Sequence, residues 1–265
     1  MKRLVILFLF LFITGVSFAQ FTDCTSGLLS IPSAEMKEEG TVSITNVFIN
    51  RHNLCPPYDG WHGWEYNTFG YGVGITFWKR LEIDYVCVLF NGKWSRSGGQ
   101  PDWFHNQDRH FSAKFQLLRE GDFFPWMPSC AVGIGDPVTG AGGGQYIGSD
   151  VSSGNGYFNR MYVAFAKNFE TPYGKVGAHL LYQHSLRSDY IARGPCLGLT
   201  WNPVWVQNIW FNPRFIVEYD ARYINMGFIA SCFKDRMEAM FELQNFKWVS
   251  FGLRYNIALL NRRYH

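Results

Sequence analysis

Ionisable side chains recur inside stretches of this chain that are otherwise apolar. They are Glu82, Asp84, Lys114, Arg160, Lys175, Glu218, Glu238, Glu242 and Arg254, with His179 and Asp220 in the same phase. Acids and bases are mixed, and ionised groups in a low-dielectric interior normally find partners. One interpretation is a set of charge pairs that partly closes a polar interior; the other is a narrow path for an ion or an acidic sugar. We favour charge pairing.

Residue types common in hydrolases lack the arrangement that catalysis needs. His179, His184 and Ser185 suggest the His–Ser pair of barrel lipases, but in a strand residues 179 and 184 face opposite sides. No acid or oxyanion pattern accompanies them. The stretch Ala141-Gly142-Gly143-Gly144 lacks the Gly-Lys-Ser/Thr of a phosphate loop, so a flexible outer loop is the better interpretation. We predict no catalytic residues and a non-enzymatic protein.

Histidine and cysteine spacing predicts neither a metal site nor a cofactor. The histidines at 52, 62, 105 and 110 are scattered over predicted loops, and the 6 cysteines contain no CxxC pair. Cys24 and Cys55 both lie outside predicted strands and could form a disulfide in an oxidising compartment. Reduced thiols packed as small apolar groups are the equal alternative.

The amino-terminal residues predict secretion. A basic head, Lys2 and Arg3, precedes an apolar run at 4–13 and a small-residue cleavage site ending at Ala19, so residues 1–19 are predicted to be a signal peptide. The run is shorter than the ~20 apolar residues that span a bilayer. Removal of the signal peptide, with Lys2 and Arg3, lowers the formal net charge of the chain from +3 to +1, which excludes a strong attraction to nucleic acid.

Alternation of apolar and polar residues predicts the elements that position the charges. In 249–257, VSFGLRYNI, every second residue is apolar, and 236–244, 222–232, 111–117 and 175–183 repeat the pattern. With the turn signals between such runs, twelve strands are predicted near 41–50, 66–78, 81–91, 109–118, 127–135, 157–168, 174–184, 193–202, 213–220, 222–232, 236–244 and 247–257.

Strand length and loop length predict a membrane barrel. The strands cluster around the ~9–11 residues that cross a membrane when tilted. Over the first eight strands, long connections at 51–65, 92–108, 136–156 and 185–192 alternate with tight ones such as 79–80, as outer loops alternate with periplasmic turns. The longer inner turn 203–212 and the short last two outer hairpins depart from this rule. We predict an all-β, transmembrane antiparallel outer-membrane β-barrel of about 12 strands, in the outer membrane of a Gram-negative bacterium. A soluble two-sheet sandwich is the alternative.

This architecture divides the mature chain into two parts. Residues 20–40 are predicted to be a periplasmic or lumen-plugging segment, and residues 41–265 form the barrel. The charged phase then lines the lumen, and outer-membrane lipid is the partner of the apolar phase. Aromatic residues at the inner strand ends predict an interfacial girdle: Trp78, Phe123, Phe124, Trp126, Phe169, Tyr173, Trp201, Trp205, Trp210, Phe211 and Phe233.

Two further sets of residues indicate partners. In the last strand, Ser250, Gly252, Tyr255 and Ile257 have the spacing of an assembly signal for the barrel-insertion machinery, although eight residues, 258–265, follow it. The aromatic residues of two outer loops, Trp61, Trp64, Trp94 and Trp103, suit stacking on sugar rings or anchoring other outer-membrane proteins. Loops that pack on each other and cap the barrel are an equally supported interpretation.

The stretch 108–125, DRHFSAKFQLLREGDFFP, is the most distinctive of the chain. With GLLSIPSA at 27–34, Glu39-Gly40, and AVGIGD at 131–136, it resembles the YjbH family of outer-membrane proteins linked to exopolysaccharide production. Members of that family are usually much longer and often lipoproteins. The resemblance implies a non-enzymatic barrel associated with export or surface display of exopolysaccharide. The alternative is a structural or interaction subunit of a larger outer-membrane complex without transport of its own.

Overall fold

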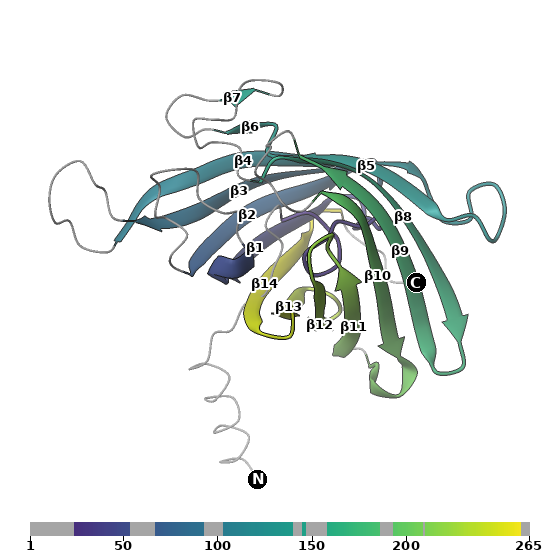
Figure 1. Ribbon diagram of the computed structural model, residues 1–265. Helices are drawn as coiled ribbons and strands as arrows, with labels where there is room; N and C mark the ends of the chain where they lie inside the picture. The colour runs from purple at the N-terminus through teal and green to yellow at the C-terminus, as the bar shows by residue number, and fades with distance from the viewer. Residues whose placement is uncertain are drawn as a thin grey trace, which may run out of the picture.

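The chain folds into a closed antiparallel β-barrel (Figure 1). The computed structural model describes residues 24–53, 67–92, 103–139, 145–146, 158–185, 193–208 and 210–260. Among these residues, twelve strands form the barrel. Their bounds are β1 (Thr41–Ile49), β2 (Thr68–Phe77), β3 (Leu81–Gly92), β4 (Trp103–Leu118), β5 (Ser129–Gly135), β8 (Arg160–Thr171), β9 (Gly174–His184), β10 (Gly194–Pro203), β11 (Phe211–Tyr219), β12 (Ile224–Cys232), β13 (Met237–Gln244) and β14 (Trp248–Ala258).

Each barrel strand pairs with its neighbours in sequence order, and β1 pairs with β14 to close the ring. In that closing ladder Thr45 lies opposite Arg254, and Phe48 lies opposite Phe251. Two short strands, β6 (Val138–Thr139) and β7 (Gln145–Tyr146), pair only with each other and lie between β5 and β8. Closure leaves no unpaired sheet edge, which is the property a sheet needs in hydrocarbon.

The twelve predicted strands are all confirmed, and their ends differ from the prediction by a few residues. The largest difference is at β4, which begins at Trp103, so the predicted outer loop 92–108 was too long. The cause is pairing: the ladder between β3 and β4 continues to Gly92 opposite Trp103, past a register shift at Phe90/Asn91. The predicted loop 136–156 also contains the β6–β7 hairpin.

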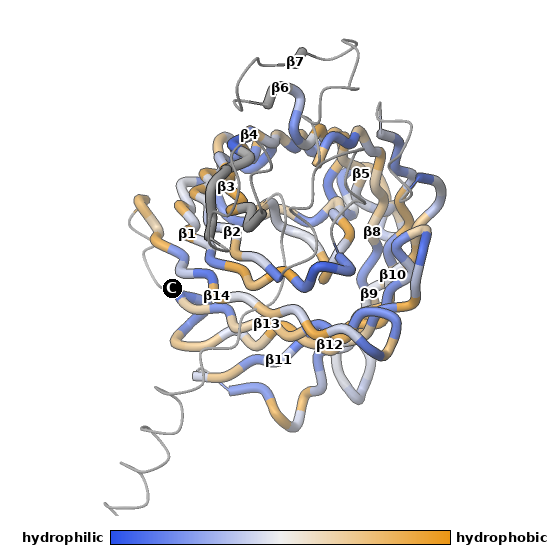
Figure 2. The backbone as a smooth tube through the Cα atoms, turned by 60° about the vertical axis from the view of Figure 1, so that its left-hand side comes forward, coloured by the Kyte–Doolittle hydropathy of each residue, from blue (hydrophilic) through white to orange (hydrophobic). Residues whose placement is uncertain are grey.

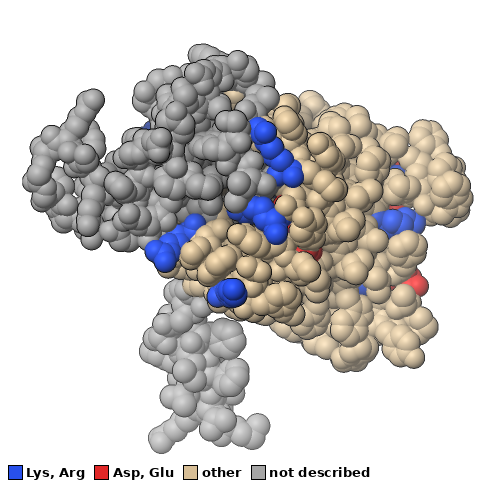
Figure 3. Space-filling model, in the orientation of Figure 1, with Lys and Arg blue, Asp and Glu red and all other residues tan. Residues whose placement is uncertain are grey.

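The two faces of the strands have opposite character, as strand alternation requires. Along β2, Phe69, Tyr71 and Val73 are exposed on the outside of the barrel, whereas Gly70 and Gly72 are buried. Hydrophobic and hydrophilic residues alternate along the tube in Figure 2. Most of the described surface in Figure 3 carries neither Lys, Arg, Asp nor Glu. The apolar phase therefore faces outward and the polar phase inward.

One end of the barrel is rich in exposed aromatic side chains. It is formed by the turns β2–β3, β4–β5, β8–β9, β10–β11 and β12–β13, and we call it the turn end; the opposite end is the loop end. Among the exposed residues here are Trp78, Phe123, Trp126, Tyr173, Trp205, Trp210 and Phe233. These rings stand where a headgroup layer would meet the strands. No described helix is both long and apolar enough to cross a membrane.

Candidate functional site

Residues 24–40, which we call the plug, lie inside the barrel (Figure 1, purple). The plug makes a tight turn in which Leu28 N donates to Ile31 O at 2.9 Å and Gly27 bridges to Pro32. Leu28, Leu29 and Ile31 are buried in one cluster with inward-facing wall residues: Ala131, Ala164, Leu181, Ile216 and Met240. Small and apolar residues on the inner wall thus make room for the turn, which fills this part of the lumen.

Carboxylates from the wall hold the tip of the plug. Leu29 N and Ser30 N donate to the two oxygens of Glu218, at 2.9 Å and 2.6 Å, and Ser30 Oγ donates to Glu242 Oε1. On the other side Arg160 Nη1 donates to Ser30 O at 3.3 Å. Hydrogen bonds between a charged group and a backbone amide are stronger than neutral ones. The wall therefore satisfies polar backbone that the turn leaves unpaired.

Lys114 of β4 anchors both ends of the plug turn. Its Nζ lies 3.0 Å from Glu82 Oε2 and donates to Ser26 O and Glu35 O, each at 2.7 Å. Glu82 in turn accepts from Ser26 N at 2.8 Å and from Ser26 Oγ at 2.6 Å. Both side chains of the ion pair are almost inaccessible, so each depends on the other for charge compensation.

Arg254 of β14 holds the beginning of the described plug. Its Nη2 donates to Cys24 O at 3.0 Å and to Thr25 O at 3.2 Å, and its Nη1 pairs with Glu238 Oε2 at 3.1 Å. Its Nε donates to Thr45 Oγ1 at 3.1 Å, across the β1–β14 seam. One guanidinium therefore connects the plug, the closing seam and β13.

The last part of the plug is held by Arg214 of β11. Arg214 Nη1 lies 2.8 Å from Glu35 Oε2, and Asn168 Nδ2 donates to Glu35 Oε1 at 3.3 Å. Burial alone would raise the pKa of Glu35, but Arg214 and, more weakly, His179 outweigh it and lower the pKa to about 2. Glu35 is therefore ionised at any ordinary pH, so its ion pair with Arg214 persists.

Lys37 stands just before β1. Its Nζ donates to Ser43 Oγ at 2.5 Å and to Asn256 Oδ1 at 3.1 Å. Burial, followed by the nearby Arg254 guanidinium, lowers its pKa to about 8. The exit of the plug is thus tied to both strands of the closing seam.

The structure places most of the predicted lumen residues in the barrel interior. Those almost fully buried are Glu82, Asp84, Lys114, Arg160, Glu218, Glu242 and Arg254. Glu238 and Lys175 are partly exposed and line a cavity near the turn end. Charge pairs form between Lys114 and Glu82 and between Arg254 and Glu238. Asp84 differs, because neither of its carboxylate oxygens has a hydrogen-bond partner in the described structure.

Several residues of the site were missed in the sequence. Arg214 follows the inward phase of β11 together with Glu218, so alternation alone would have found it. Gln116 follows the phase of Lys114 and donates to Ala34 O at 2.7 Å. Ser30 and Glu35 belong to an irregular segment, where no periodicity exists to mark them.

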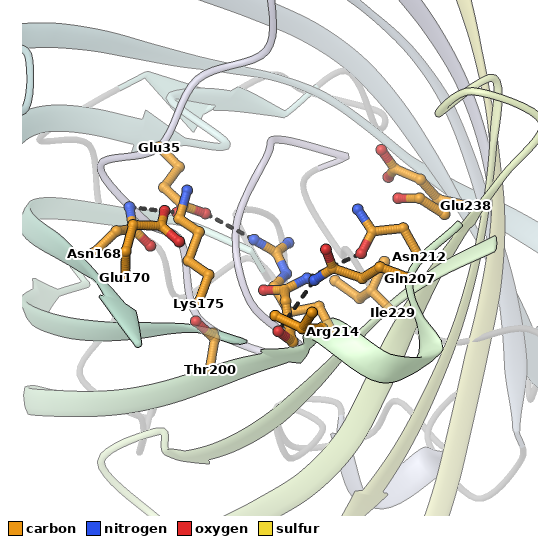
Figure 4. A pocket seen from close by; sticks show the side chains of 13 residues that line it. Glu35, Asn168, Glu170, Lys175, Thr200, Gln207, Asn212, Arg214, Ile229 and Glu238 are labelled. Carbon is orange, nitrogen blue, oxygen red and sulfur yellow. Dashed lines mark hydrogen bonds and ion pairs between the residues drawn. The ribbon is translucent and has the colours of Figure 1, made fainter. Parts of the chain in front are cut away.

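A cavity of about 430 Å³ opens beside the plug near the turn end (Figure 4). Its lining includes Glu35 from the plug together with Asn168, Glu170, Lys175, Thr200, Asn202, Val204, Gln207, Asn212, Arg214, Ile229, Ser231 and Glu238. Most of these side chains are polar, and several come from the ends of β8, β9, β10 and β11. The sequence did not indicate this site, because Glu35 of the plug completes it, far in the chain from the consecutive strands β8 to β13 that supply the rest of the lining.

The remaining predicted sites have different outcomes. Trp61, Trp64 and Trp94 lie outside the described residues, as do the predicted signal peptide and Cys55, so these predictions and the predicted Cys24–Cys55 disulfide stay untested. Trp103, His105 and His110 were wrongly assigned to loops, because all three belong to β4, which begins at Trp103. In the described part of the chain, no cluster of three or more His, Cys, Asp or Glu is placed to hold a metal ion.

The predicted assembly signal lies on β14 with its residues on two faces. Ser250 is buried, and Gly252 is buried beside it in the inward phase, while Tyr255 and Ile257 are exposed outside. Ser250 Oγ accepts from Asn53 Nδ2 at 2.7 Å. The outward pair is thus placed for contact with lipid or with another protein, and its reading by the insertion machinery stays a prediction.

Comparison with known proteins yields similarity to solved structures only. No family model matches the chain, and no curated protein matches it. An outer membrane channel from Pseudomonas putida F1 is similar with 11% identity and a TM-score of 0.43, over 86% of this chain and 98% of the channel. A triple mutant of the Rhodopseudomonas blastica porin shares 17% identity with a TM-score of 0.30, over 83% of this chain and 75% of the porin. Such similarity concerns the fold alone.

Proposed function

We propose that the protein is a non-enzymatic β-barrel of a Gram-negative outer membrane that takes part in the export or surface display of exopolysaccharide. The observation that carries the membrane part is the reversal of polarity across the barrel wall. Large apolar side chains such as Phe69, Leu199 and Phe215 are exposed outside, while Lys114 and Glu242 are buried inside. Soluble proteins rarely expose apolar surface so extensively, whereas lipid solvates it.

Fractionation tests the membrane location. We expect the mature protein to sediment with outer membranes, to need detergent for extraction and to migrate differently on gels before and after heating. A protein that stays dissolved after gentle lysis, without detergent, would contradict the proposal.

The polysaccharide part is supported by the resemblance of two sequence motifs and by their contact in space. Gln116 and Lys114, from the stretch 108–125, bind Ala34 O and Ser26 O, at and just before the stretch 27–34. Residues 82 positions apart in the chain therefore form one structural unit, a wall strand and the plug it holds. Shared motifs that meet in the fold support a shared role better than isolated matches do.

Deletion of the gene tests this role. We expect the deletion strain to lack, on its surface, a polysaccharide that the parent strain displays, either because it is not made or because it stays inside the cell. Reintroduction of the intact gene should restore the polysaccharide to the surface. Unchanged amount and composition of the surface polysaccharide would count against the proposal.

A subunit without transport of its own is the second candidate, and the filled lumen favours it. Leu28, Leu29 and Ile31 are buried, and the clamp by Glu218 and Glu242 closes around Ser30. Purification from native membranes discriminates between the two. Stable protein partners and a closed conductance trace would favour the subunit, whereas solitary particles with conductance that responds to added sugar would favour transport.

A further inference from the structure

The cavity near the turn end has the size of a ligand site but an unusually polar lining. Its volume of about 430 Å³ falls within the ~300–1,000 Å³ of small-molecule sites. Val204 and Ile229 are the two aliphatic members of its lining. Small-molecule sites are mostly lined by apolar side chains with a few polar groups. Here polar side chains outnumber apolar ones, which disfavours apolar ligands.

Carboxamide groups dominate the uncharged part of the lining. Asn168, Asn202, Gln207 and Asn212 all contribute, with the hydroxyl groups of Thr200 and Ser231. A carboxamide both donates and accepts hydrogen bonds, as a sugar hydroxyl does. Asn202 Nδ2 reaches Asn212 Oδ1 at 3.5 Å, longer than the usual range of about 2.7–3.2 Å, so a ligand hydroxyl can replace this contact at little cost.

The lining of the cavity contains three acidic and two basic residues, and Arg254, which lies outside the lining, compensates the third acid. Arg214 pairs with Glu35 at 2.8 Å, and Glu238 pairs with Arg254 at 3.1 Å. The remaining two, Glu170 of β8 and Lys175 of β9, are opposite each other in the ladder and lie side by side in Figure 4. A strongly anionic or cationic ligand would disturb this balance of charge, whereas an uncharged ligand can accept hydrogen bonds from these groups and donate to them.

We propose that this cavity binds a short, uncharged saccharide. The inference rests on the proposed function in polysaccharide export and names the ligand class for it. Because Glu35 belongs to the plug and lines the cavity (Figure 4), the complete site exists only while the plug is seated in the barrel. A bound saccharide therefore stabilises the plugged state.

Binding to the full chain in detergent micelles tests the proposal by isothermal titration and saturation-transfer NMR. The probes are three neutral trisaccharides, cellotriose, maltotriose and β-1,4-galactotriose, with trigalacturonate and the trimer of glucosamine as charged counterparts. We expect saturable binding of at least one neutral probe, and binding of the charged counterparts at least ~10-fold weaker. Failure of all three neutral probes, or preference for a charged trimer, overturns the proposal.

Matched variants show whether binding occurs in this cavity. We expect Asn212→Ala and Gln207→Ala each to weaken binding ~10-fold, the loss of about one good hydrogen bond. Asn67→Ala at the loop end, where Asn67 Oδ1 accepts from Arg51 N, serves as the control and should bind as the parent does. Heat-modifiable migration identifies any variant that fails to fold. Equal affinity in folded Asn212→Ala, Gln207→Ala and parent proteins would exclude this cavity.

The outcome is separable from that of the proposed function. Saccharide binding by the purified protein together with normal surface polysaccharide in the deletion strain would retain the site and reject the export role. Altered surface polysaccharide without binding would retain the role and reject the site.

Discussion

Lys114 shows how one buried cation can hold an irregular segment inside a barrel. The ammonium group has three protons, and its neighbours are Glu82 and the carbonyl groups of Ser26 and Glu35. A buried pair contributes little over an apolar replacement, but removal of one partner leaves a buried charge uncompensated. The stability of the seated plug is therefore most sensitive to substitutions that remove only one partner of the ion pair.

Lys114→Met tests this sensitivity. We expect the free energy of unfolding to fall by about 3–5 kcal/mol, because Glu82 is left without its cation. Urea titration of the protein folded in lipid vesicles measures the change. The double variant Lys114→Met with Glu82→Gln should regain part of the loss, since no unpaired charge remains; a double variant as unstable as the sum of the single ones would contradict the pairing.

The Glu35–Arg214 pair predicts a pH dependence of the plug. Because the pKa of Glu35 is lowered from 4.5 to about 2, the ionised carboxylate stabilises the seated plug above pH 4.5, and this contribution is lost as the pH falls toward 2. Amide exchange of residues 24–40, corrected for intrinsic rates, should show protection that decreases between pH 4.5 and pH 2.5.

Glu35→Gln is the control for this pH dependence. It should show weaker protection at pH 6 and a smaller change on acidification. An identical pH profile in Glu35→Gln and in the parent would mean that other groups cause the effect.

At the scale of elements, the plug and the wall are complementary in shape. The plug turn presents Leu28 to Gly198 of β10, where an added Cβ would lie 2.1 Å from Leu28 Cδ1. At Gly72 an added Cβ would lie 2.5 Å from Cys24 Sγ. Glycine at these inward positions thus gives the plug the close approach to the wall that its packing requires.

Gly198→Val should displace the plug. The added methyl groups occupy the place of Leu28, so we expect a higher conductance in planar bilayers than that of the parent. The compensating double variant Gly198→Val with Leu28→Ala should return to the low value, because the space is vacated. Equal conductance in all three proteins would show that the turn does not close the lumen.

At the scale of the whole molecule, the polarity of the barrel is the reverse of that of a soluble globular protein, with charged residues inside and apolar residues outside. Phe215 and Val217 on β11 and Leu197 and Leu199 on β10 form part of a continuous outward apolar surface. The aromatic residues of the turn end border this surface, as in barrels that span a bilayer. Hydrocarbon solvates such a wall at no cost, whereas water does not.

Leu199→Arg tests the apolar wall. Leu199 lies in the middle of β10 and is 60% exposed, so we expect a loss of stability of about 2–4 kcal/mol in lipid vesicles. Leu259→Arg, near the turn end and 61% exposed, is the matched control and should cost less than about 1 kcal/mol. Equal costs at the two depths would contradict a transmembrane orientation.

The sequence by itself determined the strands and their faces. Alternation is a local property, so Leu253 and Arg254 had to point to opposite sides of β14 whatever its partners were. The same alternation predicted the twelve strands and the mixed charges of the interior. It also contained Arg214, which belongs to the inward phase of β11.

Only the tertiary structure decided how the interior is used. Leu29 N binds Glu218, which is 189 residues away, and Arg214 binds Glu35, which is 179 residues away. Such contacts depend on the stagger at which the barrel closes and on the path of an irregular segment, and neither leaves a periodic trace in the chain. The seated plug arises from strand pairing around the ring, because closure brings β4, β11 and β14 around it, and the polar cavity arises where Glu35 of the plug meets the consecutive strands β8 to β13.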